Sequence, residues 1–141
     1  MKGNQTMEDV VRVLPDLKQG EAGVLQVVEM NGADLLQTLE HSITVGSDGK
    51  GWFYYFSGLR MAYAPSAKPG SRIHRITAVD GAPIVPDKIY RVAVMDQTVP
   101  KDAIQTQKNM GISIREVFVS AIREKPEITP SGDGRLIISK P

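Results

Sequence analysis

A run of aromatic side chains is the feature of this sequence with the clearest chemical potential. Five of the chain's eight aromatic residues stand in consecutive positions from Trp52 to Phe56, directly after a glycine-rich loop at residues 46–51. Because side chains alternate between the two faces of a strand, the first, third and fifth rings are expected on one face and the other two on the opposite face. A ring at the mouth of such a strand can stack on a planar ligand such as a nucleobase, a contact worth roughly 1–3 kcal/mol per base. The alternative is that one set of rings packs in the core and the other covers a helix, since aromatic side chains are strong strand formers.

Four basic residues follow the aromatic run within a short span and could face an anionic group. They are Arg60, Lys68, Arg72 and Arg75. Charged side chains are also common on the solvated face of a sheet, so the pattern by itself leaves both interpretations open.

Residues suited to catalysis or metal binding are scarce. A hydrolytic metal site needs several converging ligands, yet the chain has no cysteine and only two histidines, His41 and His74, which fit no metal-binding spacing. We expect both histidines to be structural. No G-x-S-x-G elbow presents a serine nucleophile, and the glycine-rich pieces at 46–51 and 132–134 lack the spacing of a phosphate-binding or dinucleotide-binding loop. The chain is therefore predicted to contain no catalytic residue, metal ligand or cofactor site.

Length and composition indicate one ordinary domain. The 141 residues are 41% hydrophobic, which is enough to bury a core, and no internal repeat or domain boundary is visible, so residues 1–141 are expected to form one unit. Lysine and arginine total 17 against 16 acidic residues, without the basic excess that a nucleic-acid partner requires. No stretch approaches the roughly 18 apolar residues of a membrane span, and the first residues form no apolar signal-peptide core.

Hydrophobic periodicity and capping signals predict the elements. Helices are expected at residues 6–14, 35–42 and 114–125. The first is ended by Pro15, the second is capped by the segment 31–34, and the third begins with a capping box of Ser113 and Glu116. Its inner face is expected to contain Val117, Phe118, Ala121 and Ile122.

Strands are expected at six places, and a polar stretch without periodicity, residues 96–110, is predicted to be a loop. The strands are 24–30, 52–56, 59–64, 72–79, 89–95 and 135–139, of which 24–30 and 89–95 should be the most buried. Because helices and strands do not alternate strictly, the fold class is predicted to be α+β, a single domain with a mixed β-sheet packed with about three helices.

Several motifs, taken in order, resemble the C-terminal domain of the 5'-nucleotidase family, the two-domain metallophosphoesterases that remove phosphate from nucleotides and related esters. The family pattern G-x-F-x-x-x-S-G-L is matched by residues 51–59, P-G-x-R-I by residues 69–73, and D-G-x-P-I-x-P-x-x-x-Y-x-V-A by residues 80–93. The opening T-x-x-D, the strand-helix step around Gly32 and the closing G-R at Gly134 extend the resemblance over nearly the whole chain.

The resemblance implies a role in substrate recognition. In the family, an N-terminal domain holds two divalent metals and catalyses the reaction, while the C-terminal domain binds the base between two aromatic side chains. Phe53 aligns with the first ring, and Arg60, Arg72 and Asp96 complete the predicted substrate-binding set. The second ring of the family lies after the Y-x-V-A strand, where this chain has a shorter polar loop without an aromatic residue.

Two hypotheses follow. In the first, the chain is the substrate-recognition domain of a longer hydrolase, is inactive alone, and takes a nucleotide or other small anionic substrate together with an N-terminal metallophosphoesterase domain in cis. The resemblance then implies a periplasmic, cell-surface or secreted location. In the second, the chain is a non-catalytic ligand- or protein-binding module that has lost nucleotide recognition.

Overall fold

The computed structural model describes residues 23–49, 54, 56–95, 99–125 and 132–138. The predicted helix at 6–14 and most of the predicted aromatic strand lie outside these residues. Of that run, Tyr54 and Phe56 are described, and neither belongs to a strand.

One sheet has its most buried strand in the middle. Strand β1 (Val24–Asn31) pairs antiparallel with β4 (Ile89–Met95) on one side and with β5 (Thr106–Ser113) on the other. The predicted positions of β1 and β4 are confirmed. However, β4 is an edge strand with alternating exposed residues, so the prediction that it is strongly buried was wrong. Its apolar composition reflects one packed face, because Val92 and Val94 contact the core while Arg91 and Ala93 face solvent.

The polar segment predicted to be a loop also contains a strand. Within residues 99–113, a short 3-10 helix at Lys101–Ala103 is followed by β5, whose first six residues are all exposed. Because an edge strand is stabilised mainly by its backbone ladder, β5 needs no hydrophobic run. Cross-strand polar pairs assist, as the Thr106 hydroxyl donates to a carboxylate oxygen of Glu29 at 2.7 Å and the Gln107 amide donates to the Gln26 side chain.

A second sheet of three strands follows the order β3-β2-β6. Strand β2 (Leu59–Tyr63) pairs antiparallel with β3 (Ile73–Ala78) and parallel with β6 (Leu136–Ile138). The chain turns after β3 at Asp80-Gly81, where Gly81 takes a φ of +89° that favours glycine. The α+β class is confirmed, and its strands are divided between an antiparallel and a mixed sheet.

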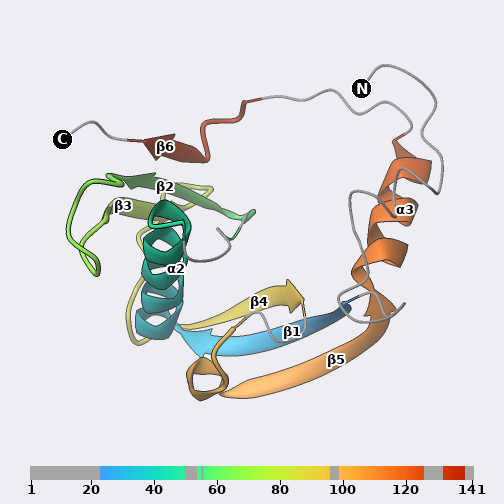
Figure 1. The fold of residues 1–141 in the computed structure, drawn as a ribbon. Coiled ribbons are helices and arrows are strands. Elements are labelled where there is room, and N and C mark those ends of the chain that lie inside the picture. Colours follow the sequence, from blue (N-terminus) through green and yellow to red (C-terminus); the bar gives the residue numbers. More distant parts are fainter. Residues whose placement is uncertain (1–22, 50–53, 55, 96–98, 126–131, 139–141) are drawn as a thin grey trace.

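Helix α2 (Gly32–Ser47) joins the cores of the two sheets (Figure 1). The Asn31 side chain caps it by accepting a hydrogen bond from the backbone N–H of Asp34 at 2.7 Å. Leu35 and Leu39 pack with Val28 and Met30 of β1, whereas Ile43, one turn further on, packs with Met61 and Tyr63 of β2. The helix extends to Ser47, beyond the predicted end at Ser42, because Ile43 is fully buried against the second sheet.

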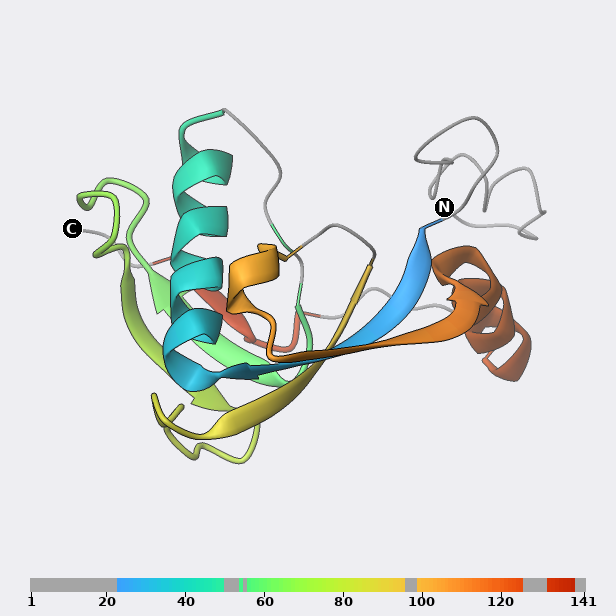
Figure 2. The same ribbon diagram turned by 90° about the horizontal axis from the view of Figure 1, so that it is seen from below.

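Helix α3 (Ile114–Glu124) lies at the opposite end of β1 and β5 from α2 (Figure 2). Its predicted capping box is present, with Ser113 and Glu116 bonded reciprocally. The predicted inner face is half right: Phe118 and Ile122 are half-buried, whereas Val117 and Ala121 are exposed, and no residue of α3 is fully buried among the described parts of the chain. The amphipathic pattern thus placed the helix correctly but not its environment.

Hydrogen bonds from the backbone N–H and hydroxyl of Ser113 lower the pKa of Glu116. A carboxyl group with a lowered pKa in the folded state stabilises that state above its unfolded pKa and loses this contribution as the pH falls through the folded pKa. We expect an NMR titration of Glu116 to have a midpoint below the ordinary glutamate range, and Ser113→Ala to move it upward. Ser120→Ala, in the same helix, is the matched control, and a midpoint unaffected by Ser113→Ala would contradict the role of the capping box.

Candidate functional site

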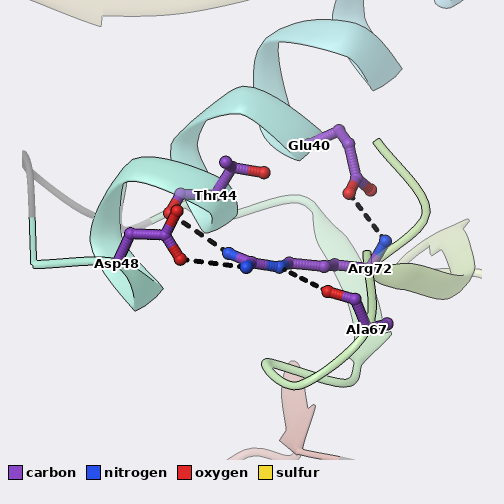
Figure 3. A network of polar contacts seen from close by, with 5 residues as sticks. All are labelled: Glu40, Thr44, Asp48, Ala67 and Arg72. Carbon is purple, nitrogen blue, oxygen red and sulfur yellow. Dashed lines mark hydrogen bonds and ion pairs between the residues drawn. The ribbon is translucent and has the colours of Figure 1, made fainter. Parts of the chain in front are cut away.

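Arg72 is the most densely bonded of the predicted site residues (Figure 3). It is only 6% exposed and lies just before β3. Its Nε donates to the carbonyl of Ala67 at 3.0 Å, one terminal nitrogen donates to the carbonyl of Thr44 at 3.1 Å, and the other meets the carboxylate of Asp48 at 2.9 Å. The guanidinium therefore joins the 64–72 connection to the C-terminal end of α2, where a positive charge also complements the helix dipole.

Glu40 supports the same junction from one turn earlier in α2. Its two carboxylate oxygens accept the backbone N–H groups of Arg72 at 2.6 Å and of Ile73 at 2.9 Å. Glu40, Thr44 and Asp48 are spaced four residues apart and so share one face of the helix. That spacing, together with a distant arginine, is the sequence signal from which the junction could have been predicted.

The other described candidate, Arg60, lies at a different end of the same hairpin. Arg60 is exposed on β2 and pairs with Thr77, whereas Arg72 adjoins the end at which Tyr63 pairs with Ile73. The structure does not bring these two arginines together. Arg72 has a structural role in its own chain, and its role in substrate binding stays a prediction, as does that of Arg60.

The two remaining candidates, Phe53 and Asp96, lie outside the described residues, but their neighbours are placed. The backbone N–H of Tyr54 donates to the hydroxyl of Ser42 at 2.7 Å, and Ser42 is 2% exposed on α2. Met95, before Asp96, pairs with Leu25 at the start of β1. Ser42 is part of the strand-helix motif that resembles the family, but no anchoring role was predicted for it.

The two histidines are exposed, His41 on α2 and His74 on β3, and neither imidazole hydrogen-bonds to another described residue. Over the described ranges, no group of three histidine, aspartate, glutamate or cysteine residues is placed to hold a metal ion. No helix in that part of the chain is long and apolar enough to cross a membrane.

Comparisons with known proteins identify the family. Residues 1–106 match the family model described as 5'-nucleotidase, C-terminal domain, and the chain belongs to this family. A snake venom 5'-nucleotidase from Crotalus adamanteus is 34% identical over 71 residues, which are 50% of this chain and 11% of the venom protein.

Solved structures show the same fold over almost the whole chain. A 5'-nucleotidase precursor from Thermus thermophilus matches with a TM-score of 0.83 and 25% identity, covering 97% of this chain and 28% of that protein. The NAD nucleotidase of Haemophilus influenzae matches with a TM-score of 0.74 at 18% identity, over 98% of this chain and 27% of that protein. The chain thus corresponds to about a quarter of the length of these two-domain proteins.

Proposed function

We propose that this chain is the substrate-binding domain of a 5'-nucleotidase-like phosphoester hydrolase. The observation that supports this most strongly is the family match over residues 1–106, together with a fold shared over 97% of the chain with just 28% of the Thermus thermophilus protein. In this proposal the chain recognises the nucleoside, while an N-terminal domain in cis holds two divalent metals and cleaves the ester. Closure between the two domains would exclude water and bring the phosphate to the metals.

Phe53 carries the base contact in this proposal. The backbone N–H of Tyr54, the residue after it, donates to buried Ser42 of α2 at 2.7 Å, so the described chain next to Phe53 is attached to the helix. An aromatic ring held in position by its surroundings would lose little conformational freedom on stacking against a base. Arg60 and Asp96 are proposed to contact the polar parts of the substrate, and Arg72 to act mainly by shaping the junction beside α2.

The test is a titration of the chain with AMP, adenosine and UDP-glucose, followed by the fluorescence of Trp52. We expect a saturable response that Phe53→Ala weakens by roughly 1–3 kcal/mol, the range for one base stacked on an aromatic ring, which corresponds to about 5- to 150-fold in Kd. Phe118→Ala, which removes a phenylalanine from α3, serves as the control. Equal affinity of the Phe53→Ala and unmodified chains would exclude the stacking role. Turnover of any of these compounds by the isolated chain with added Mg²⁺ would contradict the division of labour between domains.

A non-catalytic binding module is the second candidate. It is favoured by one observation: the connection between β4 and β5, residues 96–105, contains no aromatic residue that could complete a base sandwich. No change in Trp52 fluorescence up to millimolar concentrations of all three compounds would support this candidate instead. For either candidate we propose an extracytoplasmic location, in the periplasm, at the cell surface or secreted, because the curated relatives are venom proteins.

A further inference from the structure

A groove of about 620 Å³ opens between helix α2 and strand β3. It lies beside the junction of Arg72 and Glu40, and both histidines of the chain line it. The helix contributes Leu36, Gln37, Glu40, His41 and Thr44, and the strand contributes residues 73–76.

The strand borders the groove with its backbone edge. In the strand order β3-β2-β6, β3 is an edge strand, and four consecutive residues of it, which span the register shift of its pairing with β2, line the groove. On its other side β3 pairs with β2. Among the described residues, the outer edge of β3 has a single bridge, from Thr77 to Pro83. The backbone of residues 74–76 therefore has no strand partner on the groove side within the described part of the chain.

The opposite wall is one face of α2. The helical residues that line the groove are spaced at i, i+1, i+4, i+5 and i+8, and those positions share a face. From Leu36 to Thr44 this wall extends about 12 Å at 1.5 Å per residue. An extended chain rises about 3.3 Å per residue, so about four residues of a strand would fit along it.

The groove has polar side chains at its rim and apolar side chains at its base. Arg75 and the two histidines are exposed, while Leu36, Ile73 and Ile76 are half-buried. Glu40, the one carboxylate among the described lining residues, already accepts the backbone N–H groups of Arg72 and Ile73. A backbone edge with no strand partner in the described part of the chain, the apolar base and the exposed Arg75 guanidinium together match a peptide with alternating apolar and acidic residues.

We propose that this groove binds an extended acidic segment of a partner protein, which adds to β3 as a further antiparallel or parallel strand. The backbone of the peptide pairs with residues 74–76, its apolar side chains enter the base of the groove, and its carboxylates meet Arg75. This interaction goes beyond the proposed nucleotide recognition, and Arg60, the residue proposed to contact the nucleotide that the structure describes, does not line the groove.

The test uses the full chain and a dye-labelled pentapeptide of alternating glutamate and valine, with fluorescence anisotropy as the measurement. We expect the glutamate peptide to bind at least tenfold more tightly than the same peptide with lysine in place of glutamate. Methylating alternate backbone nitrogens of the peptide should weaken its binding at least tenfold, because N-methylation blocks strand pairing. Hydrogen exchange of the amides of residues 74–76 should slow when the peptide is bound.

Two variants distinguish binding in the groove from nonspecific attraction between charges. Arg75→Glu should weaken the acidic peptide at least tenfold, whereas Arg91→Glu, an exposed arginine on β4 of the other sheet, should leave its Kd unchanged. Equal binding of the acidic and lysine peptides would overturn the proposal, as would equal binding of the methylated peptide, complete displacement by 10 mM inorganic phosphate, or no anisotropy change up to 1 mM chain. If the chain without peptide forms a dimer that depends on Arg75, as measured by sedimentation, the outer edge of β3 binds a second copy of the chain instead of a partner peptide.

Discussion

Replacing Arg72 with methionine is expected to lower the free energy of unfolding by about 2–3 kcal/mol, because a buried arginine that joins the 64–72 connection to the end of α2 is lost. Breaking a fully buried ion pair costs about 3–5 kcal/mol. The Asp48 side chain is 32% exposed and can be solvated again once Arg72 is lost, so we expect a smaller loss here. Methionine retains the apolar stem of the side chain. The loss therefore reports the bonds to Ala67, Thr44 and Asp48 rather than a cavity.

Urea denaturation followed by circular dichroism measures this loss, and Arg75→Met is the matched control. Arg75 is three residues away and exposed, so its replacement should change stability by no more than about 0.5 kcal/mol. Arg72→Lys should fall between the two, because lysine retains the charge but not the fork of donors. If Arg72→Met and Arg75→Met unfold at the same urea concentration, the junction does not stabilise the domain, and Arg72 becomes a better candidate for substrate binding.

Gly32→Ala is expected to destabilise the domain by about 3 kcal/mol or more, against the usual benefit of alanine over glycine in a helix. A Cβ atom at this position would lie 2.1 Å from the carbonyl oxygen of Val85 and 2.8 Å from its carbonyl carbon. Residues 85–88 cannot easily move away from the helix, because the N–H groups of Gly32 and Ala33 donate to the carbonyls of Lys88 and Pro86 at 3.0 and 3.1 Å.

Thermal unfolding checks the effect of Gly32→Ala, with Gly132→Ala as the control. No atom lies within 4 Å of a Cβ at Gly132, so this second change tests the same substitution without the clash. We expect a large fall in Tm for the first and almost none for the second. A Tm for Gly32→Ala at or above that of the unmodified chain would mean that the 85–88 turn does not pack against the start of α2.

The elements that the sequence predicted well are those whose signals are local. The apolar run of β1, the Asn31 cap and the Ser113–Glu116 capping box each depend on a few adjacent residues, and all three are present. The end of α2 was predicted too early because Thr44, Val45 and Gly46 are weak helix formers. Tertiary contacts extend the helix there, since Ile43 is buried and Arg72 bonds to the carbonyl of Thr44.

The errors concern which neighbours an element meets. Strand β5 was missed because its stability comes from pairing with β1, which its polar sequence does not reveal. The burial of β4 was overestimated because apolar residue types do not show whether a strand has one partner or two. At the candidate site, the charge of Arg72 gave no sign that its guanidinium meets Asp48, 24 positions away along the chain.

The position of α2 also determines how the domain unfolds. A small sheet needs either a hydrophobic face across three or more strands or packing against a helix for independent stability. Here one helix supplies Leu35 and Leu39 to the core beside β1, and Ile43 to the core beside β2. Separating either sheet from the helix would expose apolar side chains of both partners, so we expect neither sheet to persist as a stable intermediate. We therefore expect both sheets to be lost in a single transition.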